Sequence, residues 1–525
     1  MNRKLFKISI LLAFILMAGC SEDFLEVSPK GQVSSDNFLT NEDELRQGLI
    51  GIYDLIQYNY SHGGWASVYF IKNLPADDVL AAGGGPTDQQ EYQYLDDFNI
   101  LSDNSKLESI WTNFYKTINS CNTIINNLKD NEDMSDEMLN MLAEAKTIRA
   151  FTYLDLVIMW GGVPLLLENP ETEDQYHLPR SSQADVYEQI EKDLTEAIPN
   201  LYLKSEYSNA DKFRFSKGAA KAILGKAYLY QEKYSDAATE LGEIISSGEY
   251  SLEADFQDVW DMDNEFGDES LFEVSYVSSE LYDWGNFPWG GGNESNIEVQ
   301  LQGPRDIYFN LTNVPLDVMN GWGFNLPSAE IGDLFVAELA GDNDSSRYWG
   351  TLVSASDLEA LTPPSDTVVL AEAGVDHDYE GYMRLKYVTR PSTTSESGVR
   401  ELNHGINWRL IRYADVLLMA AEAYHKSGDD GSAQTELAKV YNRARGTNET
   451  ITATGDALFD MIVKERQMEL AFEGSRYWDL IRWGMAVEEL GDIGFTANRH
   501  ELFPIPQNEI IANNAISEED QNPGY

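Results

Sequence analysis

Apolar residues recur at intervals of three and four in several stretches of the chain, which is the pattern of helices with one buried face. Leu45, Leu49, Ile52 and Ile56 follow this spacing and predict a helix over residues 38–57. Two further stretches show long helical patterns, at residues 111–128 and 137–160. Helices therefore dominate the expected fold.

One stretch, residues 456–484, combines a helical stripe with acids. On a helix that starts near Ala457, Glu465 and Glu469 share a face with apolar residues. Buried carboxylates are costly unless they are paired, so this face requires basic partners. The candidate basic residues are the two that follow a predicted turn at 473–475, together with one on the 137–160 helix: Arg476, Arg482 and Arg149.

Two interpretations of these acids are open. They can belong to a helical hairpin held by an internal charge network, in which Asp479 also pairs with the arginines three residues to either side of it. Alternatively, they can be a catalytic pair. The first interpretation is favoured, because arginines that satisfy the acids also keep them ionised and poor at proton transfer.

Matching small and aromatic positions indicate tetratricopeptide-like helical hairpins. The two sets are Leu224, Gly225, Tyr228, Ala237 and Ala420, Ala421, Tyr424, Ala433. They are about 200 residues apart, so something interrupts the helical scaffold.

The interruption, residues 262–404, is rich in glycine, proline, serine and threonine. Alternating runs at 271–277 and 382–388 predict short strands, and residues 281–350 are expected to form no long helix. The predicted fold class is mainly α: a tetratricopeptide-like helical-hairpin scaffold with a loop-rich, mixed α/β insert that carries the binding surface.

Charge and chemistry exclude several classes of function. Among 525 residues, 37 Lys and Arg against 88 Asp and Glu give a net charge of −51, which disfavours nucleic acid and anionic surfaces as partners. The six histidines lack zinc-ligand spacing, and no nucleotide-binding or serine-hydrolase motif is present. Acidic runs such as 255–269 could bind calcium, but they lack the EF-hand pattern and are better explained as solvated loops. No cofactor and no catalytic activity are expected.

The N-terminus has the features of a targeting segment. Basic residues precede an apolar run at 8–18 that is too short to span a bilayer. The run ends in LMAGC, which resembles a bacterial lipoprotein box. That resemblance implies that residues 1–19 are a signal peptide and that Cys20 carries the lipid anchor. The alternative is an ordinary secretory signal that is cut elsewhere.

Several motifs together resemble the SusD/RagB family. They are WRLIRYADVLLMAAEA at 408–423, the ER…EGSRYWDL stretch at 465–480, FPIP at 503–506 and the terminal QNPGY, with GGVPL at 161–165 and similar segments upstream. The resemblance extends over nearly the whole chain. It divides the mature protein into an N-terminal SusD-like helical region, residues 20–235, and a C-terminal region, residues 260–525.

This resemblance implies a surface-exposed, lipid-anchored outer-membrane protein on tetratricopeptide-like helices. Such proteins bind glycans and form a lid over a TonB-dependent transporter of the SusC type; they are not known for catalysis. Peptide binding of the RagB kind, or a purely structural lid, is the alternative. The family's motifs are scaffold, and its binding loops vary, so the site must be argued from this chain's own residues.

Aromatic residues in the loops are the candidates for glycan contact. Sugar rings have apolar faces that stack on flat side chains, and Trp284, Trp289 and Trp322 stand beside Gly or Asn, where little else covers an indole. Trp65 is a weaker candidate. The alternative is that these rings pack the lobe's own core. The tryptophans on helical patterns are expected to be core: Trp111, Trp160, Trp408, Trp478 and Trp483.

Overall fold

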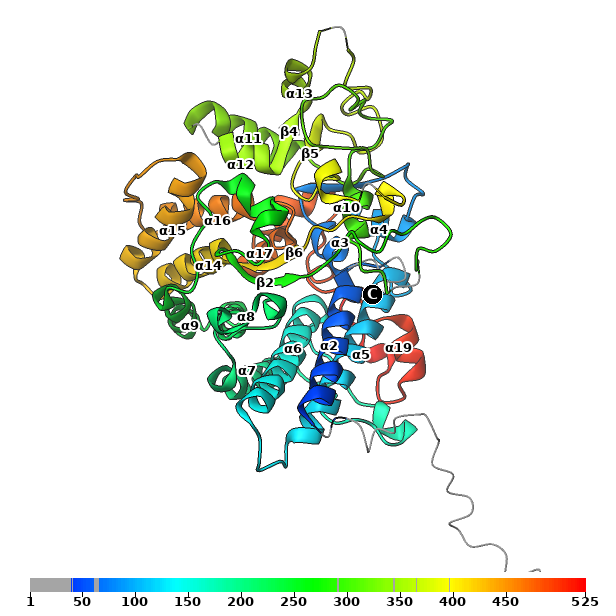
Figure 1. Ribbon diagram of the computed structural model, residues 1–525, viewed down its shortest axis with the longest axis vertical. Coiled ribbons are helices and arrows are strands. Elements are labelled where there is room, and N and C mark those ends of the chain that lie inside the picture. Colours follow the sequence, from blue (N-terminus) through cyan, green and yellow to red (C-terminus); the bar gives the residue numbers. More distant parts are fainter. Residues whose placement is uncertain are drawn as a thin grey trace, which may run out of the picture.

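Helical hairpins make up most of the molecule in the computed structural model (Figure 1). The structure describes residues 39, 41–60, 66–289, 292–342, 345–364, 366–395 and 397–525, so Cys20 and Trp65 lie outside the described residues. Mainly helical architecture confirms the predicted fold class. None of the helices in the described ranges is long and apolar enough to traverse a lipid bilayer.

The N-terminal half supplies long helices that pack side by side at the lower end of Figure 1. They are α2 (Glu42–Tyr60), α5 (Ser105–Leu128), α6 (Asp136–Trp160) and α7 (Gln183–Ala197), with the short α3 (Val68–Asn73) and α4 (Gln90–Asp96) between α2 and α5. α5 begins six residues before the predicted helix, because the Asn104 side chain caps it by accepting from the N–H groups of Lys106 and Leu107. Ser135 caps α6 in the same way.

Two hairpins match the predicted tetratricopeptide-like positions. They are α8 (Lys217–Tyr230) with α9 (Tyr234–Ser247), and α14 (Tyr413–Lys426) with α15 (Asp430–Arg445). A Cβ added at Gly225 would lie only 2.7 Å from Leu241 Cγ, so the glycine lets α8 and α9 approach closely. A Cβ at Gly242 of α9 would meet the Tyr424 hydroxyl of α14 at 2.6 Å. The two hairpins, far apart in sequence, therefore pack on each other.

The C-terminal part completes the helical scaffold. It contains α16 (Asp456–Glu469), α17 (Arg476–Trp483), α18 (Ala486–Leu490) and α19 (Gln507–Ala512). The predicted break between α16 and α17 is present, and Gly474 adopts φ +78°, a conformation that favours glycine.

The strands in the described ranges pair into two-stranded antiparallel sheets, two of which join the lobe at 262–404 to the scaffold and one of which lies within the lobe. β1 (Val79–Ala82) pairs with β3 (Phe324–Pro327), β2 (Ser270–Val274) pairs with β6 (Trp408–Arg412), and, within the lobe, β4 (Leu352–Ser354) pairs with β5 (Tyr382–Arg384). β2 and β5 fulfil the prediction of short strands. The β2–β6 pairing is irregular, with Phe272 opposite Ile411 but Glu273 opposite Arg409.

The lobe also carries helices. They are α10 (Ile297–Gln302), α11 (Ala329–Asp342), α12 (Ser345–Thr351) and α13 (Ala355–Leu361). Three of them, α11 to α13, lie at the upper end of Figure 1. The expectation of no long helix between 281 and 350 is wrong, because α11 spans 14 residues. The prediction took the glycines of this stretch as helix breakers. Gly332 instead lies within α11, where a Cβ would be 2.3 Å from the Tyr382 ring, so this glycine allows close packing of the helix.

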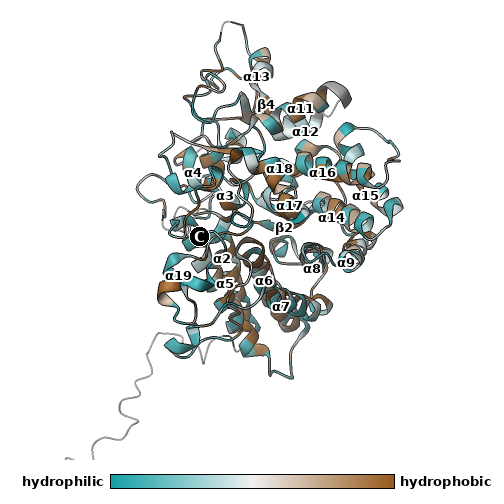
Figure 2. Cartoon of the chain, turned by 180° about the vertical axis from the view of Figure 1, so that it is seen from behind, coloured by the Kyte–Doolittle hydropathy of each residue, from teal (hydrophilic) through white to brown (hydrophobic). Residues whose placement is uncertain are grey.

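Aromatic contacts join segments that are far apart in sequence within the main apolar core. Tyr69 of α3 stacks on Trp408 of β6 with ring centroids 4.2 Å apart, and Phe215 stacks on Phe272 of β2 at 3.8 Å. Apolar residues concentrate on central helices such as α3 and α6, while outer helices such as α9 are more hydrophilic (Figure 2). The five tryptophans predicted to be core are buried except Trp483, which is half-buried, and Trp408 lies on a strand rather than a helix.

Candidate functional site

The lobe places three predicted site residues next to one another. The indoles of Trp284 and Trp289 have centroids 6.2 Å apart and planes 14° apart, and those of Trp289 and Trp322 are 6.4 Å and 22° apart. Trp284 is 55% exposed, whereas Trp289 and Trp322 are half-buried. The three rings form a row that is here called the indole row.

A tight turn presents the first two rings. Asp283 accepts hydrogen bonds at its side chain from the backbone N–H groups of Gly285 (2.7 Å) and Asn286 (3.1 Å), and its carbonyl accepts from Phe287. The Asn286 side chain in turn accepts from the Asp283 N–H at 2.6 Å. These local bonds are typical of Asp and Asn in turns, and they fix the backbone of the turn on which the exposed Trp284 stands.

Two glycines let the third ring join them. A Cβ at Gly321 would lie 2.5 Å from Gly303 Cα, so only glycine allows this segment to run against the end of α10. Gly323, on the other side of Trp322, has φ +74°. The Trp322 N–H donates to the Gln300 carbonyl at 2.8 Å. The glycines beside Trp322 therefore position the ring as well as leaving it uncovered.

A small apolar cluster supports the indole row from below. It consists of the buried Phe287, Ile297 and Leu402, with Tyr282, Trp289, Trp322 and Val399 packed against it. The buried Asn403 fixes the cluster, because its side chain exchanges hydrogen bonds with the backbone of Tyr282 (2.8 and 2.9 Å). Packing inside the lobe was the alternative to ligand contact. It explains the partial burial of Trp289 and Trp322, but Trp284 is not part of this cluster.

The sequence reasoning missed the residues that hold the row. Tyr282 and Phe287 meet edge to face at 5.2 Å, and Phe287 contacts Trp289 at 4.6 Å. Tyr282 and Phe287 lie within a few residues of Trp284 and Trp289, and this concentration of aromatic residues in a short Gly- and Asn-containing stretch could have identified them as part of the site. Asn403, more than a hundred residues away, gave no such signal.

A buried pair of polar side chains close to Trp322, those of His404 and Gln300, is uncharged. His404 is fully buried, its Nε2 lies 3.1 Å from Gln300 Oε1, and burial lowers its pKa to about 3. The imidazole is therefore neutral at physiological pH, and Gln300 joins it to the backbone that carries Trp322. Besides Gln300, the Trp322 backbone contacts the guanidinium of Arg305, which donates to the Trp322 carbonyl at 2.9 Å. With indole rings, a neutral imidazole and an arginine, which does not lose its proton near neutral pH, the site suits stacking rather than proton transfer.

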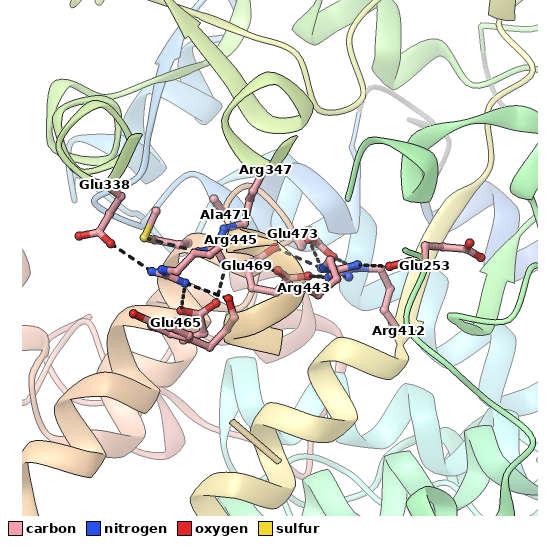
Figure 3. Close-up of polar contacts among 12 residues, drawn as sticks. Glu253, Glu338, Arg347, Arg412, Arg443, Arg445, Glu465, Glu469, Ala471 and Glu473 are labelled. Carbon is pink, nitrogen blue, oxygen red and sulfur yellow. Dashed lines mark hydrogen bonds and ion pairs between the residues drawn. The ribbon is translucent and has the colours of Figure 1, made fainter. Parts of the chain in front are cut away.

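Glu465 and Glu469, the acids of the alternative catalytic interpretation, belong to a buried network of ion pairs (Figure 3). Glu465 pairs with Arg347 (2.6 Å) and Arg445 (3.1 Å). Glu469, with no exposed surface, pairs with Arg443 (2.5 Å), Arg412 (3.1 Å) and Arg347 (3.4 Å). The need for basic partners is confirmed.

The predicted identity of those partners is wrong. Arg476 pairs with Asp77 at 2.6 Å, and Arg149 pairs with Asp193 at 2.7 Å. Arg482 pairs with Glu422 and, as predicted, with Asp479. The true partners come from α12, β6 and α15, which only tertiary packing brings to α16.

This network holds Glu469 ionised. Burial alone would raise its pKa, but Arg443, Arg412 and Arg347 outweigh that effect and hold the pKa at about 2. A carboxylate that does not take up a proton near neutral pH is a poor general acid or base. The network is therefore structural, as the favoured interpretation had it.

Acidic side chains converge at one further place in the described part of the chain. Oxygens of Asp77, Glu330 and Glu489 lie within 4.8 Å of one another. Arg476 already lies against this group, 2.6 Å from Asp77 and 3.6 Å from Glu489. A guanidinium thus supplies the positive charge that a cation would bring.

Comparisons with known proteins agree with this architecture. Residues 365–494 match the model of the SusD family, and residues 23–229 match the model described as starch-binding associating with outer membrane. A solved structure, a laminarin binding SusD-like protein, is 34% identical, has a TM-score of 0.79 and covers 92% of this chain and 100% of its own.

Two other relatives extend the likeness. SusD-like protein P25 of Formosa agariphila is 26% identical over 98% of this chain and 99% of its own. Surface glycan-binding protein A from Bacteroides thetaiotaomicron, solved in complex with laminarihexaose, is 24% identical with a TM-score of 0.75, and it covers 91% of this chain and 99% of its own. By fold, by family models and by a 34% identical structure that covers most of its length, this chain belongs to the SusD family.

Proposed function

We propose that this protein is a cell-surface lipoprotein that captures a glycan on the indole row and delivers it to a SusC-type TonB-dependent transporter. The indole row is the observation that carries the proposal, because three near-parallel indoles gathered in one place offer flat apolar surface on which sugar faces can stack. Trp284, Trp289 and Trp322 are the proposed contacts, with Trp65 as a further candidate.

Laminarin is the first glycan to test, because the 34% identical structure is that of a laminarin binding protein. Isothermal titration calorimetry of the purified full-length protein against laminarin should show saturable binding. Peptide mixtures and a uronic-acid polysaccharide serve as comparison ligands. Binding of peptides with no response to any glycan would favour the RagB-like alternative, and no binding at all would favour a purely structural lid.

Delivery requires that the protein stays at the outer membrane. The family model over residues 23–229 names association with the outer membrane, which supports this location. Lipidation at Cys20 is the proposed means, since an apolar run ends directly before Gly19-Cys20. The SusC-type partner is proposed from membership of the family.

Cys20→Ala should abolish the anchor. The thiol is the group that carries the lipid, so the variant should not incorporate a palmitate analogue and should leave the outer-membrane fraction. Metabolic labelling of cells that express wild-type or variant protein measures this. Cys121→Ala is the matched control, because it removes the other cysteine, which is buried in the fold. A Cys20→Ala protein that still takes up label would contradict the anchor assignment.

A further inference from the structure

A concave site lies where the lobe meets the segment at 257–261, and its lining shares no residue with the indole row. It is a cavity of about 710 Å³ between residues 257–263, 316–318 and 390–393 and the ring of Trp349. Sites for small molecules have volumes of about 300–1,000 Å³. Exposed residues form part of its lining, among them Asp258, Asp261 and Asp317. The cavity is therefore open to a ligand from solvent.

Its lining offers the groups that an uncharged sugar needs. Trp349 contributes a half-buried aromatic ring, and the ring of the buried Trp260 also forms part of the wall. Arg390 donates to the carbonyls of Asp317 (3.2 Å) and Leu385 (3.0 Å). These two bonds use two of the five N–H groups of its guanidinium and hold the side chain in the wall of the cavity. Aromatic, donor and acceptor groups thus line one space.

Charge decides which sugars fit. Asp258, Asp261, Asp263 and Asp317 all line the cavity, against the single cation Arg390. Carboxylates accept strong hydrogen bonds from hydroxyl groups but repel uronate and sulfate groups. Their oxygens do not converge as metal ligands do, since Asp77, Glu330 and Glu489 are the group that converges within the described ranges. The lining therefore favours an uncharged sugar over an acidic sugar or a metal ion.

The cavity is within reach of the indole row. Asp317 and Trp322 are five residues apart on one segment, so their backbones are at most about 18 Å apart. The Met319 N–H donates to the Thr389 carbonyl at 2.9 Å, which ties this segment to the one that carries Arg390. One oligosaccharide can therefore contact both places.

We propose that this cavity is a second saccharide subsite, which binds an uncharged part of the same glycan chain that the indole row holds. The proposal rests on the proposed function. Two linked contacts on one ligand raise its affinity, because the second contact forms at high effective concentration. Glycan length should therefore control binding.

The test compares laminaritriose with laminarihexaose by calorimetry on the full-length protein. Wild type should bind the hexasaccharide about 10-fold more tightly or better. Two cavity variants are used: the double change Gln257→Ala with Asp258→Ala, which removes exposed polar groups, and Ser392→Trp, which fills the rim from an exposed position. Each should lower hexasaccharide affinity about 5- to 10-fold and leave trisaccharide affinity unchanged. Glu188→Ala, exposed on α7 of the scaffold, is the control.

The outcomes separate the two proposals. Wild-type hexasaccharide affinity in both cavity variants, or an equal loss for both ligands, overturns the second subsite while the indole row still binds the trisaccharide. No binding of any glycan by wild type overturns the proposed function and the subsite with it. A uronic-acid hexasaccharide should bind more weakly than laminarihexaose, and tighter binding would overturn the assignment to uncharged sugars.

Discussion

Glu469→Ala should lower the free energy of unfolding by about 3–5 kcal/mol, because it removes a carboxylate shared by Arg347, Arg412 and Arg443 and leaves their buried positive charge in excess of the remaining acids. The guanidiniums of Arg412 and Arg443 lie within 3.1 Å of the carboxylate, and Glu469 has no exposed surface. Chemical denaturation followed by circular dichroism measures the change. Glycan affinity of the folded protein should stay unchanged, since the network lies outside the indole row.

A surface pair provides the matched control. Glu168 pairs with Lys129 at 3.1 Å, and their side chains are 69% and 46% exposed. Glu168→Ala should cost no more than about 1 kcal/mol. Equal effects of the two substitutions, or loss of glycan binding by a stable Glu469→Ala protein, would count against a structural role for the network.

The contribution of Glu469 should depend on pH in a defined direction. Its pKa is held at about 2 in the folded protein, against 4.5 for the ordinary carboxyl group. The unfolded chain therefore takes up the proton first as the pH falls, so the stabilisation is complete above about 4.5 and is lost towards 2. The difference in stability between wild type and Glu469→Ala should shrink across that window. A difference that stays constant from pH 7 to pH 2 would contradict the assignment.

Removal of the indole row should have the largest effect on binding. Each ring that stacks on a sugar face is worth about 0.5–1.5 kcal/mol on the scale of aromatic pairs, so each single Trp→Ala change should weaken laminarin binding about 3- to 10-fold. The triple variant of Trp284, Trp289 and Trp322 should weaken it about 30-fold or more. Calorimetry gives the affinities, and circular dichroism reports the fold.

Controls separate ligand contact from packing. Trp284 is the cleanest probe, because it is 55% exposed, and Trp284→Phe should retain part of the affinity by keeping a flat ring. Leu281→Ala is matched to it, since Leu281 is 47% exposed in the same loop but has no ring to stack. Wild-type affinity in the triple variant would place the glycan elsewhere. Loss of helical signal in the Trp289 or Trp322 variants would show that these half-buried rings mainly support the lobe.

Some features were determined by sequence because their causes are local. Apolar spacing alone predicted α6 to within one residue at its start, and the small residues around Gly225 predicted a close hairpin. The need to neutralise Glu465 and Glu469 also followed from sequence, since a carboxylate on a buried face is costly whatever surrounds it. The glycine and asparagine neighbours of Trp284, Trp289 and Trp322 marked all three as candidates, but only Trp284 is exposed, whereas Trp289 and Trp322 are half-buried.

Other features were decided only by tertiary structure, because they depend on residues far apart in the chain. Arg347 and Arg443 reach Glu469 from α12 and α15, whereas the nearby Arg476 turns to Asp77, almost 400 residues before it. The same holds for the row of rings, which needs Asn403 to fix the turn at Tyr282 and Gly321 to bring Trp322 against α10. Local spacing sets which face of a helix is buried, but the shape of the packed chain selects the partner of each buried charge and the neighbours of each exposed ring.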